Sequence, residues 1–144
     1  MPHTLVAELP AARSQPLEWS DPAFAAMTRA ERRLAEGFLG ADEVLLAVQT
    51  ESRVDVGRWR GQGRLWAFAL RDHLALVAHG PRPYAKRIPY SRIRESTYNP
   101  VTGELVLAPP HHLHVQGIRM APLEGYQMLA QIHKEATVHA PASD

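Results

Sequence analysis

Hydrophobic and polar residues alternate along the middle of the chain, which is the pattern of β-strands. Between residues 64 and 107, short apolar runs are separated by short turn signals, and no helical period interrupts them. One side of the extended chain carries Trp66, Phe68 and Leu70, and a three-residue turn leads into a second alternating run over residues 73–79. The pattern therefore predicts a strand, a tight turn and another strand at the centre of an antiparallel sheet.

The same alternation continues on both sides of this hairpin. Gly61 and Gly63 favour a hairpin before it, because glycine adopts positive φ without penalty, and Pro89 marks a sheet edge or a bulge. We expect seven strands, over residues 42–56, 64–71, 73–79, 84–90, 91–98, 105–107 and 113–118.

Helical periods flank the strands. An amphipathic stripe predicts a helix over residues 21–39, with Asp21 as its cap and Pro22 at its first position. Thr28 and Glu31 have the spacing of a second capping box, so two short helices are the alternative.

A second helix is expected over residues 122–137, where its broad apolar face would close one end of the strands. Tyr126 and Leu129 are the expected plug. The proline-rich residues 1–20 predict a flexible arm and residues 139–144 a frayed tail, which leaves a single domain over residues 21–138.

Local motifs add a family resemblance to this order of elements. The hairpin sequence LRDHLALV at residues 70–77 looks like that of bacterial pleckstrin homology (PH)-like and GRAM-like domains. In those families the hairpin is followed by a segment such as IPYSRI, here residues 88–93, and then by a turn such as TGEL, here residues 102–105. FLGADEVL at residues 38–45 is similar to the start of that group. The resemblance covers residues 38–137, and Arg71 replaces the threonine usual in the hairpin.

This resemblance implies a PH-like seven-stranded antiparallel barrel over residues 42–119, capped by the C-terminal helix and preceded by an added N-terminal helix. It also implies that the first hairpin loop, here residues 57–63, is the usual contact for lipid headgroups. The chain has no dense K-x-R signature of a phosphoinositide site.

Composition narrows the class of protein. At 144 residues the chain can bury roughly 70% of its unfolded surface, and it has no cysteine for a disulfide or a thiolate site. Pro2, Glu8 and Pro10 interrupt the N-terminus, which does not fit a secretory signal, and no apolar run approaches the roughly 20 residues of a membrane helix. We expect a soluble cytoplasmic protein.

The net charge of +1 is unevenly distributed. Residues 53–94 hold 10 basic and 2 acidic side chains, a net charge of +8, whereas the segments on either side are net acidic. Arginine, which suits phosphate and carboxylate, supplies 14 of the 16 cations. Solvated outer faces of strands would explain the same charges. The alternative is an anion-facing surface, whose candidate ligand-binding residues are Arg53, Arg58, Trp59, Arg60 and Arg64.

Other chemistry has weaker support. His112 and His114 would share a face of a strand and are the candidate metal ligands, but no acidic residue lies near them in sequence. The chain has no nucleophile elbow, Walker loop or dinucleotide motif, so we predict no cofactor.

We therefore expect a non-enzymatic binding or scaffolding module that recognises a protein partner or self-associates, through an exposed strand edge or the loop 57–63. Contact with an anionic membrane surface is its nearest rival. Nucleic-acid binding by residues 53–94 is the alternative, and a metal-dependent enzyme ranks last.

Overall fold

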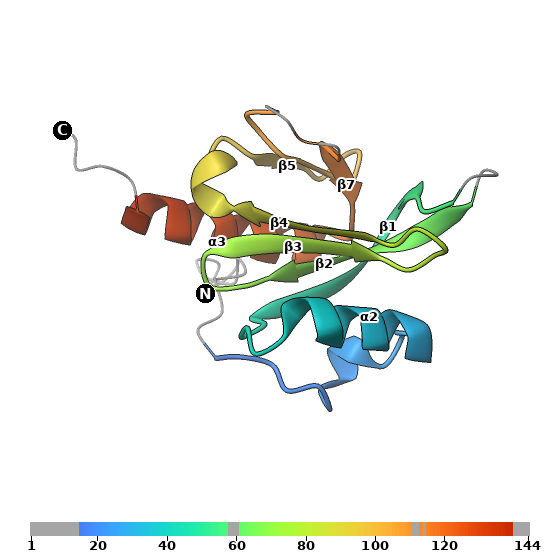
Figure 1. Cartoon of the computed structure of the whole chain (residues 1–144). Helices are drawn as coiled ribbons and strands as arrows, with labels where there is room; N and C mark the ends of the chain where they lie inside the picture. Colours follow the sequence, from blue (N-terminus) through green and yellow to red (C-terminus); the bar gives the residue numbers. More distant parts are fainter. Residues whose placement is uncertain (1–14, 58–60, 111–112, 114, 140–144) are drawn as a thin grey trace, which may run out of the picture.

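The structure, a computed structural model, describes residues 15–57, 61–110, 113 and 115–139. Seven strands form two antiparallel sheets, one in the order β1-β2-β3-β4 and one in the order β5-β6-β7 (Figure 1). The elements are η1 (Pro22–Phe24), α2 (Arg29–Leu39), β1 (Leu46–Asp55), β2 (Gln62–Ala69), β3 (His73–Ala78), β4 (Tyr84–Pro89), η2 (Tyr90–Arg92), β5 (Thr97–Asn99), β6 (Glu104–Val106), β7 (Gly117–Arg119) and α3 (Pro122–His139).

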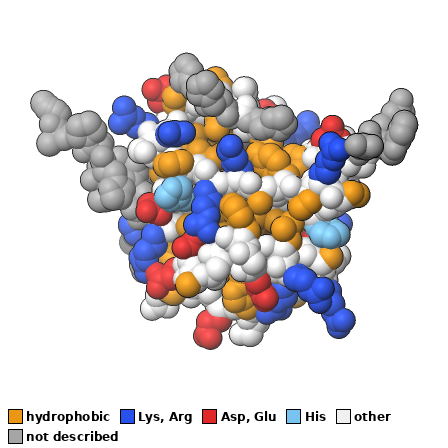
Figure 2. Space-filling view, in the orientation of Figure 1, with side chains coloured by type: hydrophobic (Ala, Val, Ile, Leu, Met, Phe, Trp, Pro, Cys, Tyr) orange, Lys and Arg blue, Asp and Glu red, His pale blue; other side chains and the backbone are white. Residues whose placement is uncertain are grey.

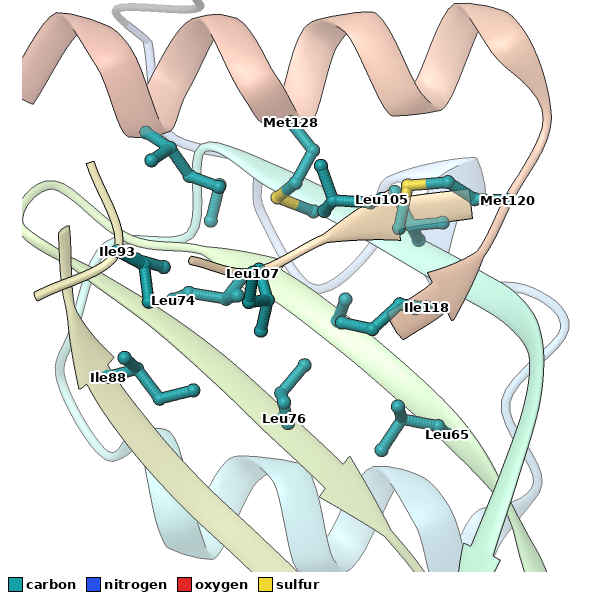
Figure 3. Close-up of a cluster of buried hydrophobic side chains, with 14 of the residues drawn as sticks. Leu65, Leu74, Leu76, Ile88, Ile93, Leu105, Leu107, Ile118, Met120 and Met128 are labelled. Carbon is teal, nitrogen blue, oxygen red and sulfur yellow. The ribbon is translucent and has the colours of Figure 1, made fainter. Parts of the chain in front are cut away.

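The four-stranded sheet is buried on both faces, which explains why its central strands are apolar on both sides. Leu65 and Leu76 point into the larger core, which the sheet shares with β5–β7 and α3 (Figure 3). Trp66 and Phe68 point the other way, into a second core under η1 and α2. The strand–turn–strand prediction for residues 64–79 is confirmed, and the β2–β3 register pairs Trp66 with Val77.

Two short helical segments replace the single helix expected over residues 21–39, as the alternative prediction had it. The capping box forms: Glu31 N donates to Thr28 Oγ1 at 3.0 Å, and Thr28 N donates to Glu31 Oε1 at 2.9 Å. Satisfying these two backbone donors starts a new helix at Arg29. Helix α2 then lies over the outer face of the four-stranded sheet, opposite the second sheet (Figure 1).

The closing helix lies where it was expected, but other side chains fill the interior. Met128 and Ile132 are fully buried in the larger core, whereas Tyr126 and Leu129 are only partly buried at its margin. The sequence pattern predicted the helix but not the residues that lie deepest in the core. The reason is that the tertiary contact surface, not the width of the arc, decides which residues lie deepest.

The strands do not close into a barrel. The chain leaves β4 through the short helix η2, so the strand expected over residues 91–98 is replaced by a 3-10 turn and the short β5. At the opposite corner β1 and β7 are joined, because Arg119 N donates to Ser52 Oγ at 2.9 Å. The strands β5–β7 therefore form a sheet of their own, which packs with the four-stranded sheet over the larger core. None of the helices in the described residues is long and apolar enough to cross a membrane.

Candidate functional site

Arg53 and Arg64 lie opposite each other on β1 and β2. Register partners project from the same face of a sheet, so both guanidinium groups belong to one surface. Arg53 is exposed and Arg64 is half-buried. With the Gln49 amide oriented to satisfy its neighbours, its oxygen accepts from Arg64 Nε at 3.2 Å. The structure thus places the predicted residues Arg53 and Arg64 side by side. Of the two, Arg64 is hydrogen-bonded to Gln49.

Arg53 also lines a groove of about 420 Å³ between β1 and β7. The charged side chains of the lining are Arg53, Arg119, Glu51 and Asp55. Two cations and two carboxylates sum to zero formal charge, so this groove has no net attraction for an anion.

Five of the predicted residues lie outside the described part of the chain: Arg58, Trp59, Arg60, His112 and His114. Among the described residues, no group of three or more potential ligands from His, Asp and Glu lies together. The ligand and metal predictions that depend on these five residues remain predictions.

His133 on α3 is engaged by the backbone. Its Nε2 lies 3.0 Å from the carbonyl oxygen of Ser96, so that nitrogen carries the proton and donates it. The Ser96 hydroxyl in turn donates to Ile93 O at 2.6 Å and accepts from Ala108 N at 3.0 Å. This chain of hydrogen bonds ties α3 to the turn after η2 and gives His133 a structural role.

Two groups where the start of α3 packs against β5 have shifted pKa values, Tyr98 on β5 and Glu124 on α3. Burial raises the pKa of the Tyr98 phenol, whose hydroxyl donates to Met120 O at 2.8 Å. Burial also raises the pKa of the Glu124 carboxyl, and the negative charge of Glu51 adds to this effect. Both shifts arise where α3 packs against β5, so they reflect burial at a packing contact.

A basic surface surrounds β4. Residues 81–95 contain five basic side chains and one acidic side chain, a net charge of +4, and all five basic residues are exposed. We call this set the β4 basic cluster: Arg82, Lys86, Arg87, Arg92 and Arg94. Within the described residues, only Arg87 of the cluster forms an ion pair, with Asp42. On the face of the molecule toward the viewer, basic side chains lie beside hydrophobic ones (Figure 2).

The register of β4 identifies which of its backbone groups point away from the sheet. Tyr90 N donates to Asp72 O at 3.1 Å, and the β3–β4 register continues this pairing through Leu74–Ile88 and Leu76–Lys86. Hydrogen-bonded and non-hydrogen-bonded pairs alternate along an antiparallel ladder. The backbone groups of Ile88 and Lys86 therefore bond to β3, and those of the residues that alternate with them point away from β3.

The β2–β3 hairpin leads to the same assignment independently. Leu70 N donates to His73 O at 2.9 Å, so His73 and every second residue after it bond to β2. Leu74 and Leu76 are then left to bond to β4. It follows that Ala85 and Arg87 of β4 turn both their N–H and C=O groups to the outer edge. Among the described residues, none forms a backbone hydrogen bond to these groups.

Arg87 is held in place by α2. Its Nη2 donates to Phe38 O at 2.7 Å, and its guanidinium carbon lies 5.0 Å from the centre of the Phe38 ring. The ion pair with Asp42 adds a third contact. These contacts hold the Arg87 side chain against the end of α2.

A shallow hollow of about 400 Å³ adjoins this end of β4. Its lining carries two ion pairs, one between Arg71 and Glu43 at 2.5 Å and one between Arg87 and Asp42. His73 Nδ1 lies 2.8 Å from Asp72 Oδ1 in the same hollow. Each charge thus has a neighbour of opposite sign or a polar partner, which favours a structural role over ligand binding.

Sequence reasoning did not single out the outer edge of β4. The available signal was Pro89, whose position predicted an edge or a bulge, and the structure confirms the edge. The alternation of its backbone groups required the register with β3, which sequence does not supply.

No protein-family model matches the sequence, and no curated protein or solved structure shows significant similarity to the chain.

Proposed function

We propose that this chain is a non-enzymatic binding module of PH-like fold that recognises a protein partner through the outer edge of β4. The observation that carries the proposal is the pair Ala85 and Arg87, whose backbone groups point out of the sheet without a backbone partner in the described residues. An edge with unused donors and acceptors can take an added strand from another chain.

The arrangement of the elements supports the PH-like part of the proposal. A four-stranded and a three-stranded antiparallel sheet pack over one core, and the C-terminal helix α3 contributes Met128 and Ile132 to it. Separation of the sheets at the β4–β5 corner leaves β4 as an edge strand, which a closed barrel would not have.

The grooves support recognition of an extended segment over capture of a small ligand. Small-molecule sites are mostly apolar cavities with a few converging polar groups. The two hollows described above are shallow and lined by charges of both signs.

Anionic surfaces remain the second candidate, because the β4 basic cluster has a net charge of +4. A nucleic acid held by these side chains should be released steeply by salt. A partner held by backbone hydrogen bonds should depend much less on salt.

The test is a selection from a displayed library of random peptides on the full chain. We expect enriched peptides to bind the wild type and to lose at least about tenfold in affinity with Ala85→Pro, because proline removes the outward N–H and its ring occupies the edge. Ala85→Val is the matched control, since it keeps the N–H and suits a strand.

Circular dichroism must show that Ala85→Pro keeps the wild-type spectrum. Proline is tolerated on an edge strand where its nitrogen faces solvent, so we expect the variant to fold. If no peptide is enriched, or enriched peptides bind the Ala85→Pro protein as well as the wild type, the proposed function is wrong.

A further inference from the structure

We infer that the outer edge of β4 takes an extended acidic peptide segment, added as a fifth strand with a carboxylate opposite Lys86. This inference rests on the proposed function and specifies the chemistry of its partner.

The first argument is the charge beside the edge. Lys86 is exposed on the strand itself, and Arg82, Arg92 and Arg94 are exposed on the segments that enter and leave it. None of these four side chains forms an ion pair within the described part of the chain. A partner strand that carries carboxylates would be attracted by these cations, which form no ion pair within the described residues. A partner strand that carries lysine or arginine would be repelled.

The second argument is the mixture of donors and acceptors. Ala85 and Arg87 present two N–H groups and two C=O groups along the outer edge. A phosphate of a lipid or a nucleic acid is mainly an acceptor, so it would leave the two carbonyl groups unpaired. A peptide backbone offers N–H and C=O groups in alternation and can satisfy all four.

The third argument concerns a second copy of this chain. Two β4 strands paired antiparallel, with Ala85 bonded to Arg87 of the partner copy, would place the two Lys86 side chains opposite each other. Like charges directly opposite across a strand pair are destabilising. The edge therefore selects against self-pairing while it favours an acidic strand.

Side-chain alternation along β4 indicates where the carboxylate belongs. Lys86 lies on the same face of β4 as Ile88; Ile88 is buried in the larger core, whereas Lys86 is exposed. Ala85 and Arg87 lie on the other face, where Arg87 is already bound to Asp42. The acidic residue of an added strand should accordingly face Lys86, with apolar or small residues on either side of it.

The probe is a capped peptide of alternating valine and glutamate, about six residues long to match Tyr84–Pro89. Binding to the full chain is measured by fluorescence anisotropy. We expect Lys86→Glu to weaken binding by roughly tenfold, because an attractive pair becomes a repulsive one. Arg119→Glu is the matched control: it also reverses one exposed cation, but on β7 in the other sheet, and we expect no change.

Two further peptides separate charge from strand addition. The same acidic peptide with every second backbone nitrogen methylated should bind at least about tenfold more weakly, because it cannot pair with the edge. A peptide of alternating valine and lysine should not bind. Equal losses with Lys86→Glu and Arg119→Glu, or full binding of the methylated peptide, would overturn the inference.

The library selection distinguishes this inference from the proposed function. If enriched peptides depend on the N–H of Ala85 but are neutral or basic, the proposed function stands and the acidic specificity is wrong. If an oligonucleotide or a phosphatidylserine vesicle competes for the edge and Ala85→Pro does not affect that competition, both are wrong.

Discussion

At the scale of single residues, Gly125 shows how closely α3 approaches the second sheet. A Cβ atom added at this position would lie 2.2 Å from Cε1 of Tyr98, well inside van der Waals contact. The same tyrosine donates to Met120 O and makes an edge contact with Tyr126, with ring centres 5.1 Å apart. Glycine is therefore required here by the aromatic ring beneath the helix, despite its cost in helix propensity.

Gly125→Ala should lower the free energy of unfolding by about 1–3 kcal/mol, because the methyl group forces the ring or the helix to move. Gly37→Ala is the matched control on α2: an added Cβ has no atom within 4 Å, so alanine should be neutral or stabilise by up to about 1 kcal/mol. Urea denaturation followed by circular dichroism measures both. Equal effects of the two substitutions would contradict the close approach.

At the scale of elements, β4 combines one bonded edge and one open edge. Its inner edge pairs with β3 over the whole strand, from Tyr84 opposite Ala78 to Pro89 opposite His73. Pro89 has no N–H, and its position in the alternation is one whose nitrogen points outward, so the ladder loses no hydrogen bond there. Pro89 therefore lies at the end of β4 without disturbing its pairing with β3.

Amide hydrogen exchange should reveal this alternation directly. We expect the N–H groups of Lys86 and Ile88 to be protected by β3, and those of Ala85 and Arg87 to exchange faster, because they face solvent. Two-dimensional NMR after transfer to deuterated water measures the rates residue by residue. Uniform protection along β4 would mean that its outer edge is covered, and the proposed binding edge would then be wrong.

At the scale of the whole molecule, α3 joins the two sheets. Met128 and Ile132 are fully buried in the core that contains Leu65 and Leu76 of the first sheet and Leu105 of the second (Figure 3). The helix therefore packs against side chains of both sheets in one core.

Met128→Ala should destabilise the whole domain by about 2–5 kcal/mol, because it leaves a cavity between the helix and both sheets. Leu123→Ala is the matched control on the same helix: Leu123 is 61% exposed, so its loss should change stability by less than about 0.5 kcal/mol. Thermal unfolding followed in the near and far ultraviolet measures both. Loss of the helix signal before that of the sheets would show that α3 does not join them.

The sequence by itself determined the features that depend on neighbouring residues. Alternation predicted β2 and β3, the spacing of Thr28 and Glu31 predicted the second helix start, and Pro89 predicted an edge or a bulge. Each is a local property, because strand period, capping and the missing N–H act within a few residues.

Tertiary structure alone decided the features that depend on distant residues. Contacts across the fold separate the strands into two sheets and bury Met128 more deeply than Tyr126. They also direct the backbone groups of Ala85 and Arg87 away from the sheet. Alternation in one strand is the same whether its edge is paired or open. Only the position of a strand in the sheet, set by packing between remote segments, makes β4 an edge strand.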